Sequence, residues 1–280
     1  MGNSPTSPPP EILPPHGEYA PPPPRPRQRR GWASAPATHL LVGINCAVYL
    51  LMVARGAGIW NPSVERLMQW GADNAGSVLI YGQWWRIVTA MFVHVGILHL
   101  ATNMWCLWNL GLLAEPLMGS FGLVAVYILT GAAGNLLSTA YNWFRPMHYG
   151  SAIIFPAGAG ASGAVFGIAG ALIILLKSSR LPIPQFELKR LRRSVIYFAA
   201  INLVIGLSVN FGSGFTGVKI DNSAHIGGVL SGLLFAAPLV PRIGSPRAEF
   251  EMRMRLAVAA MVVLLVLFGF YVAHIPPPQG

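Results

Sequence analysis

Seven apolar segments follow one another along the chain, and each is close to the length of a helix that crosses a lipid bilayer. Their approximate limits are 38–54, 93–114, 120–141, 161–176, 194–210, 224–240 and 256–273. Pro116 and Gly119 separate the second segment from the third, and a long mixed segment, 55–92, separates the first from the second. The pattern predicts an all-α, polytopic membrane protein.

The composition agrees with lipid as the main solvent of this chain. Of its 280 residues, 54% are hydrophobic and 10% are charged, whereas a soluble domain carries roughly 25% charged residues. The formal net charge of +10 would suggest a nucleic-acid partner in a soluble protein. Here the cations lie between apolar segments, so we interpret them as topology signals and expect no nucleic-acid partner.

The chain divides into three predicted regions. Residues 1–36 are rich in proline and polar groups, which predicts a disordered cytoplasmic tail. Residues 37–240 form the predicted membrane domain, and 241–280 form a loop and a C-terminal transmembrane helix. The first residues, MGNSPT, fit a loose N-myristoylation pattern, and the sequence leaves open whether Gly2 is lipidated.

Basic residues predict the orientation in the membrane. Of the 19 cations, 14 lie before the first segment, between the fourth and fifth, or between the sixth and seventh. The positive-inside rule then places the N-terminus in the cytoplasm and the C-terminus outside. The second, fourth and sixth segments therefore run from outside to inside. No organelle transit sequence is evident, and we expect a multi-pass protein of a bacterial inner membrane.

Polar residues gather at the outer ends of these three segments. Ser162 lies at the start of the fourth, Asp221 and His225 at the start of the sixth, and His99 and Asn103 at the start of the second. A serine needs a general base to act as a nucleophile, and His225 is the candidate base. His99 and Asn103, four residues apart on one helix face, are candidate donors to an oxyanion, as is the Ser162 backbone N–H.

Other interpretations of these residues stay open. Ser162 could be a helix cap, because serine is a favoured N-cap residue. The Gly163/Gly167 and Gly228/Gly232 pairs could serve helix packing alone, since small residues at this spacing let two helices approach closely.

The acid and thiol groups narrow the chemistry. The chain has two aspartates, Asp73 and Asp221, and both lie in or near outer loops. An intramembrane aspartyl protease needs two such carboxylates inside its membrane helices, so this class is excluded. We favour a Ser-His dyad, with Asp221 capping or orienting. No HExxH sequence occurs, and Cys46 and Cys106 lie inside apolar segments, where we interpret them as buried thiols. We therefore expect no metal and no cofactor.

Four short motifs, in their order along the chain, resemble those of the rhomboid intramembrane serine proteases. They are Trp85-Arg86, His99-x-x-x-Asn103, Gly160-x-Ser162-Gly163 and Ala224-His225-x-x-Gly228-x-x-x-Gly232. The resemblance covers about 38–240 and implies a six-helix bundle. The seventh helix is similar to the extra C-terminal helix of the six-plus-one form.

The resemblance implies a role for each matching residue. Ser162 would be the nucleophile and His225 the base, with His99, Asn103 and the Ser162 amide forming the oxyanion hole. Phe166 would stack on His225, where the family often has tyrosine. The residues implied to be structural are Gly160, Gly163, Gly228, Gly232, Trp85, Arg86 and His94.

The chain departs from the family pattern after the second segment. Many members have a Glu-x-Arg pair there, whereas this chain has Glu115-Pro116-Leu117 and lacks the arginine. The missing arginine puts in doubt the structural salt bridge expected at the inner end of the second segment, but it does not affect the proposed roles of Ser162 and His225.

The implied function is a serine endopeptidase that cleaves transmembrane protein substrates near the outer face through an acyl-enzyme, with membrane lipids as surrounding partners. One alternative is an inactive relative that binds transmembrane helices, but both Ser162 and His225 are present. A small transporter is another, but its site would lie near the membrane midplane. The sequence leaves the substrate and the oligomeric state open.

Overall fold

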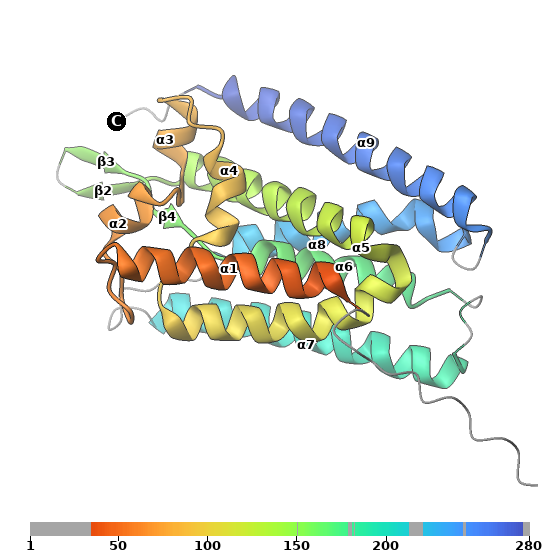
Figure 1. Ribbon diagram of the computed structural model, residues 1–280. Coiled ribbons are helices and arrows are strands. Elements are labelled where there is room, and N and C mark those ends of the chain that lie inside the picture. Colours follow the sequence, from red (N-terminus) through yellow and green to blue (C-terminus); the bar gives the residue numbers. More distant parts are fainter. Residues whose placement is uncertain are drawn as a thin grey trace, which may run out of the picture. The chain divides into compact units, whose positions relative to one another are not determined.

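A computed structural model describes residues 35–149, 151–178, 181, 183–212, 221–242 and 245–276. Each predicted apolar segment falls on a helix (Figure 1). The longer helices are α1 (Pro36–Ala54), α5 (Ile97–Phe144), α6 (Ser162–Leu175), α7 (Gln185–Gly212), α8 (Asn222–Ala236) and α9 (Arg247–Ala273). The predicted tail, with Gly2, lies outside the described residues except for its last two positions.

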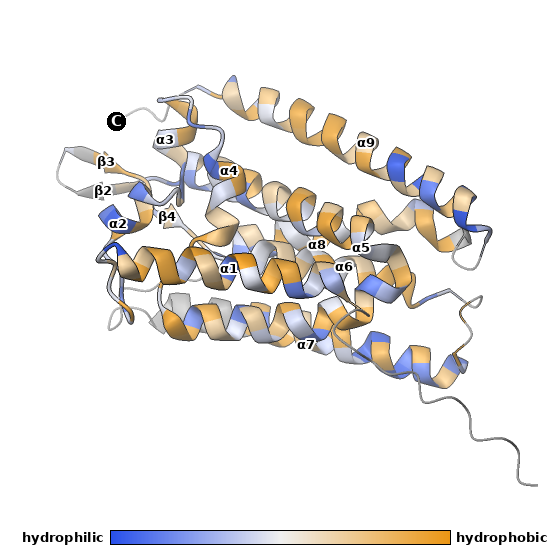
Figure 2. Ribbon diagram, in the orientation of Figure 1, coloured by the Kyte–Doolittle hydropathy of each residue, from blue (hydrophilic) through white to orange (hydrophobic). Residues whose placement is uncertain are grey.

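Four described helices are long and apolar enough to cross a membrane. They are α1, α5, α9 and the helix Asn222–Val240, in which the 3₁₀ helix η3 (Ala237–Arg242) continues α8. α6 is a shorter apolar helix of 14 residues. The predicted fold class, an all-α polytopic membrane protein, is confirmed. Most of the length of α9 is coloured as hydrophobic in Figure 2, and many of its apolar residues are exposed.

α5 joins the second and third predicted segments into one bent helix of 48 residues. Pro116 stays inside the helix, and the break falls at Gly119, whose φ of 75° favours glycine. Near this break, Glu115 accepts hydrogen bonds from the backbone N–H groups of Ala37 and Thr38, each at 2.9 Å, and from the hydroxyls of Thr38 and Ser120. Glu115 therefore caps the start of α1, where N–H groups lack helical partners.

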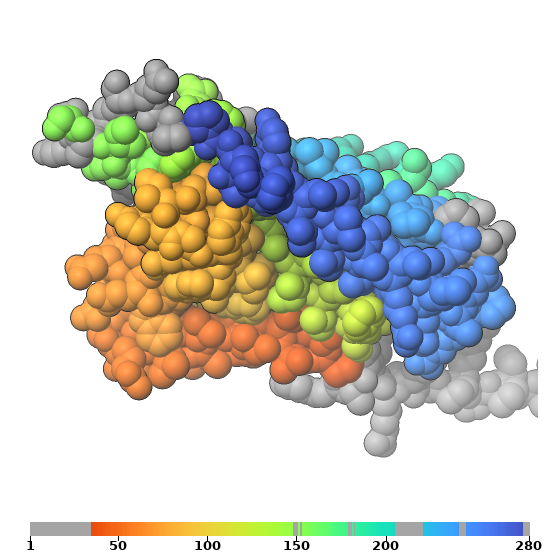
Figure 3. Space-filling model, turned by 90° about the horizontal axis from the view of Figure 1, so that it is seen from above, coloured from red at the N-terminus to blue at the C-terminus, as the bar shows by residue number. Residues whose placement is uncertain are grey.

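The first loop, 55–96, contains several short elements. They are α2 (Val64–Gln69), β1 (Asp73–Asn74), α3 (Ala75–Leu79), α4 (Arg86–Thr89) and the 3₁₀ helix η2 (Ala90–Phe92). Figure 3 shows this loop beside α9. A Cβ atom added at Gly269 of α9 would lie 3.8 Å from the Trp84 ring, so the two pack together.

Four short strands interrupt the helical pattern, and the sequence pattern predicted none of them. β2 (Met147–Tyr149) pairs with β3 (Ala152–Ile154), and β1 pairs with β4 (Ala157–Gly158), both antiparallel. Strands of two or three residues are too short to show the alternation that identifies a strand. The β1–β4 pair connects the first loop to the segment that leads into Ser162.

α6 lies at the centre of the helices, with α5 and α8 packed against it (Figure 1). Its residues from Gly163 to Leu172 are all buried. Because the helix is surrounded by protein, it carries no polar face and no charged side chain. Its first residue, Ser162, is half-buried at the end of this packed helix.

Candidate active site

Ser162 and His225 meet at the end of the molecule where α5, α6 and α8 begin. The Ser162 Oγ atom lies 2.9 Å from the His225 Nε2 atom, within hydrogen-bond distance. Ser162 is the first residue of α6, and His225 is in the first turn of α8, where its side chain is buried. Ala161 occupies the N-cap position of α6, so the hydroxyl of Ser162 is free of a capping role.

Glycine pairs bring the two helices close enough for this contact. A Cβ atom added at Gly228 would collide with the carbonyl oxygen of Gly163, and one added at Gly232 would collide with that of Gly167. The backbones of α6 and α8 therefore touch, which only glycine permits at these positions. The predicted packing role of the glycines and the Ser162–His225 contact are thus parts of one arrangement.

The imidazole of His225 is held by stacking. The Phe166 ring lies parallel to it, with centroids 4.2 Å apart and an angle of 11° between the planes. The Phe198 ring of α7 also lies near Phe166, with centroids 6.0 Å apart and an angle of 38° between the planes. An aromatic ring one turn below Ser162 thus fixes the plane in which the imidazole lies.

Asp221 caps α8. Its Oδ1 atom accepts a hydrogen bond from the Ala224 N–H at 3.1 Å and its Oδ2 atom accepts one from the Ser138 hydroxyl. Within the described chain, the Nδ1 atom of His225 has no hydrogen-bond partner. Asp221 therefore holds the start of the helix that carries His225, and among the described residues no carboxylate is hydrogen-bonded to the Nδ1 atom of that imidazole.

His99 and Asn103 lie on the first turns of α5. A Cβ atom added at Gly160 would lie 2.6 Å from Cε1 of His99, so the imidazole packs against the backbone just before Ser162. Gly160 has a φ of 132°, a conformation that favours glycine. The Asn103 side-chain amide donates to the His99 carbonyl at 2.8 Å. The second N–H of that amide is available to another acceptor.

His94 contributes to the site more directly than the sequence interpretation assigned. It is fully buried, and its Nε2 atom accepts a hydrogen bond from the Ala161 N–H at 3.4 Å, while its Nδ1 atom lies 3.3 Å from the Phe92 carbonyl oxygen. Its ring centroid is 5.4 Å from that of His99. His94 therefore holds the residue that precedes Ser162. In the sequence, the feature that could have indicated this role is the position of His94 at the same end of the second apolar segment as His99.

Trp85 and Arg86 hold the first loop. The Arg86 guanidinium donates to the carbonyl oxygens of Met68 and Ala72, at 2.8 and 2.9 Å, and to the Gln83 side chain. It also lies 4.5 Å from the centroid of the Trp85 ring. Burial lowers the pKa of Arg86. The contacts are those of a structural residue that closes the loop on itself.

Asp73 is a buried carboxyl group in the first loop. It is 2% exposed, and its Oδ2 atom accepts a hydrogen bond from the Thr139 hydroxyl of α5 at 2.9 Å. Burial raises the pKa of Asp73 to about 7, and the negative charge of Asp221 adds to the rise. Adjacent residues of α5, Ser138 and Thr139, thus bind one aspartate each, from α8 and from the first loop.

The described residues contain no group of three or more histidine, cysteine or acidic side chains able to hold a metal ion. Cys46 and Cys106 are free thiols. The chemistry available at the described site is that of a hydroxyl, an imidazole and hydrogen-bond donors.

Comparison with known proteins identifies the family of this chain. The Rhomboid domain family matches residues 81–242. Rhomboid protease GluP of Bacillus subtilis (strain 168) is 32% identical over 86% of this chain and 41% of its own length. Rhomboid protease AarA of Providencia stuartii is 32% identical over 71% of this chain and 70% of its own length.

A plant protein is also similar. RHOMBOID-like protein 6, mitochondrial, of Arabidopsis thaliana is 31% identical over 68% of this chain and 55% of its own length. The chain thus spans about two fifths to two thirds of the length of these relatives. The matched domain contains the four motifs and every helix that forms the site, and the chain belongs to the rhomboid family.

Proposed function

We propose that this protein is an intramembrane serine endopeptidase, with Ser162 as nucleophile and His225 as general base. The observation that carries the proposal is the 2.9 Å separation between Ser162 Oγ and His225 Nε2, in a contact between a half-buried serine and a buried imidazole. A hydroxyl at this distance from an imidazole can transfer its proton as it attacks a carbonyl carbon. The names of the relatives GluP and AarA, both rhomboid proteases, support the same reaction class.

The reaction proceeds in two halves. His225 takes the hydroxyl proton while Ser162 Oγ bonds to the carbonyl carbon of the substrate, giving a tetrahedral oxyanion. The C–N bond then breaks, His225 gives its proton to the leaving amine, and Ser162 carries the acyl group as an ester. In the second half, His225 takes a proton from water, the hydroxide attacks the ester, and the proton returns to Ser162 as the acid leaves.

Three donors are proposed to stabilise the oxyanion. The backbone N–H of Ser162 lies at the start of α6, where no helical partner uses it and the helix dipole favours negative charge. The Asn103 amide has one N–H beyond the one that the His99 carbonyl accepts. His99, packed against Gly160, is the third. Such donors, fixed before the reaction, are worth more in a site that excludes water.

Transmembrane protein segments are the proposed substrates. The site lies at the ends of apolar helices, and the positive-inside rule, applied to the charges of the chain, supports an outer position for that end and a cytoplasmic N-terminus. A bacterial inner membrane is the proposed location. A substrate helix hides its peptide bonds in its own hydrogen bonds, so it must unwind to react. Substrates with helix-breaking residues near the outer face are therefore expected to be cleaved fastest.

The test is cleavage of a transmembrane substrate by purified protein in liposomes, with Ser162→Ala and His225→Ala as variants. We expect cleavage by the wild type and none above background by either variant, with all three proteins folded. A folded wild type that binds the substrate without cleaving it would contradict the proposal and favour a protein that binds transmembrane helices.

A further inference from the structure

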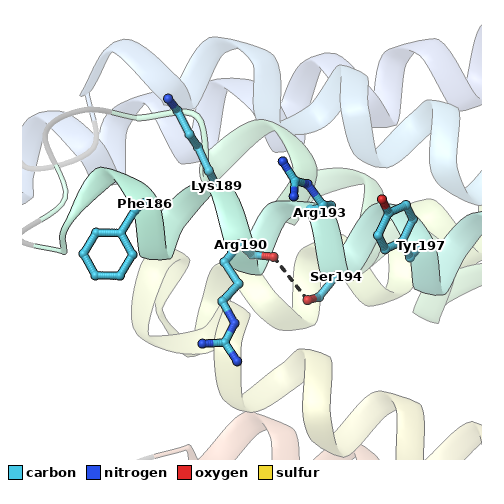
Figure 4. Close-up of a pocket in the computed structure, with 6 residues that line it drawn as sticks. All are labelled: Phe186, Lys189, Arg190, Arg193, Ser194 and Tyr197. Carbon is cyan, nitrogen blue, oxygen red and sulfur yellow. Dashed lines mark hydrogen bonds between the residues drawn. The ribbon is translucent and has the colours of Figure 1, made fainter.

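The first residues of α7, at the end of the helices where α6 ends (Figure 1), form a basic hollow (Figure 4). We call this hollow, of about 310 Å³, the α7 foot. It is lined by Phe186, Lys189, Arg190, Arg193, Ser194 and Tyr197.

The side chains of the α7 foot follow the spacing of one helix face. Phe186, Arg190, Ser194 and Tyr197 are separated by three or four residues, so they form a continuous stripe. The aromatic rings stand at its two ends. In Figure 4, Lys189 and Arg193 leave one side of the helix and Arg190 the other, so cations border the hollow on two sides. The Ser194 hydroxyl bonds to the Arg190 carbonyl and so is already used as a donor.

Among the described residues, the cations of the α7 foot have no acidic partner in an ion pair. In the part of the chain that the structure describes, no carboxylate lies within ion-pair distance of Lys189, Arg190 or Arg193. By contrast, Arg247 at the start of α9 pairs with Glu251 at 2.7 Å. Lys189 and Arg193, four residues apart on α7, repel each other, and Arg190 adds a third positive charge beside the hollow. The hollow is therefore complementary to a negatively charged group.

Apolar side chains continue the same face of the helix beyond the hollow. Ile201 and Val204 follow Tyr197 at helical spacing, and they are 57% and 60% exposed. A ligand that fits the whole face needs an anionic head and an apolar tail. Arginine is suited to phosphate oxygens, and aromatic rings are common at the level of lipid headgroups.

We propose that the α7 foot binds the phosphate headgroup of an anionic phospholipid, with the acyl chains lying along Ile201 and Val204. The proposal goes beyond the peptidase function and does not depend on it. Cations near an anionic membrane surface each add to the attraction, and salt screens it. A specific site predicts retention of lipid after extraction, whereas cations that only set topology predict none.

The test is lipid retention by the purified full-length protein in detergent, measured by native mass spectrometry. The probes are phosphatidylglycerol and phosphatidylcholine with the same acyl chains, and inorganic phosphate is the competitor. The variant is Lys189→Gln/Arg190→Gln/Arg193→Gln. The matched control, Lys177→Gln/Arg253→Gln/Arg255→Gln, removes the same charge from α9 and from the residues after α6.

We expect the wild type and the control to prefer phosphatidylglycerol by about tenfold or more, and the variant to lose that preference. Salt should weaken the preference of the wild type, a result that needs no variant to fold. Equal retention by variant and wild type would overturn the proposal, as would equal loss in variant and control. Complete displacement of phosphatidylglycerol by millimolar inorganic phosphate would overturn the lipid proposal and show that the α7 foot binds the free anion. Ser162→Ala protein should give the wild-type result, which separates this site from the peptidase.

Discussion

The contact between α6 and α8 differs from the contacts of α7 in what lies between the helices. Gly228 and Gly232 place the backbone of α8 directly on that of α6. α7 instead reaches the same core through side chains, among them the ring of Phe198 against that of Phe166. An apolar groove of about 260 Å³ lies between α7 and the other two helices.

This difference indicates that the distance between α6 and α8 is fixed more closely than the distance between α7 and its neighbours. A backbone contact cannot adjust by changing rotamers, so it sets the separation of Ser162 and His225 closely. Contacts through side chains leave α7 free to move slightly at little cost. We therefore expect substitutions on the α6–α8 side to reduce cleavage strongly and matched substitutions on α7 to reduce it weakly.

The largest difference in cleavage rate is expected between alanine variants of two asparagines that make the same local hydrogen bond. Asn103 of α5 and Asn202 of α7 each donate to the carbonyl four residues earlier at 2.8 Å. Asn103→Ala should lower kcat by about 10²–10³-fold with little change in KM, because an oxyanion donor acts in the transition state. Asn202→Ala should stay within about threefold of the wild type, since loss of a local bond costs about 1 kcal/mol at most. Equal losses in the two variants would contradict the proposed role of Asn103.

The second prediction tests the backbone contact itself. Gly228→Ala adds one methyl group against the Gly163 carbonyl, whereas Ala200→Val on α7 adds two methyl groups beside the apolar groove. We expect Gly228→Ala to cost about 1–3 kcal/mol of stability and to lower cleavage by about 10²-fold, because the two reacting side chains move apart. Thermal unfolding in detergent and cleavage rates measure both. Wild-type stability and cleavage in Gly228→Ala, together with a loss of both in Ala200→Val, would contradict the proposed importance of the α6–α8 contact.

The third prediction concerns Phe166, which stacks on His225, and Phe198, whose ring is tilted against that of Phe166. Phe166→Ala removes the ring that lies on His225 and should lower kcat by about tenfold, the size expected for loss of an aromatic pair. Phe198→Ala removes the outer ring and should have a smaller effect on the same assay. Phe166→Tyr keeps the stack and should restore most of the activity. Failure of tyrosine to do so would show that packing volume matters more than ring stacking.

The smallest effect is expected from the buried carboxyl group of the first loop. The pKa of Asp73 is raised to about 7, above the unfolded value of about 4. The group thus favours the folded state below pH 4, and this contribution is lost as the pH rises through 7. Asp73→Asn should unfold a few degrees above the wild type at pH 8, and this difference should shrink as the pH falls and vanish below pH 4. The control Glu187→Gln on α7 should show the same pH dependence of the unfolding temperature as the wild type. If Asp73→Asn also showed the wild-type pH dependence, the assignment of that dependence to Asp73 would be contradicted.

Much of this arrangement can be predicted from the chain alone. Apolar runs identify the helices, and the alternation of their direction brings Ser162, His225 and His99 to one end before any contact is known. The hydrogen bonds from Ala37 and Thr38 to Glu115 could not be predicted, because they join residues 77 and 78 positions apart without a local pattern. The same holds for the β1–β4 pair and for the hydrogen bond from Ala161 to His94. Such contacts follow from how the helices pack, which the pattern of one helix does not contain.

The most direct test of the central claim is covalent labelling of the folded protein with a fluorophosphonate, followed by peptide mapping of the adduct. The account predicts one modified residue, Ser162, with labelling abolished in Ser162→Ala and strongly slowed in His225→Ala, while Asn202→Ala is labelled at the wild-type rate. Labelling at a neighbouring hydroxyl such as Ser138 or Ser223, or no labelling of a folded wild type that still binds transmembrane segments, would contradict it.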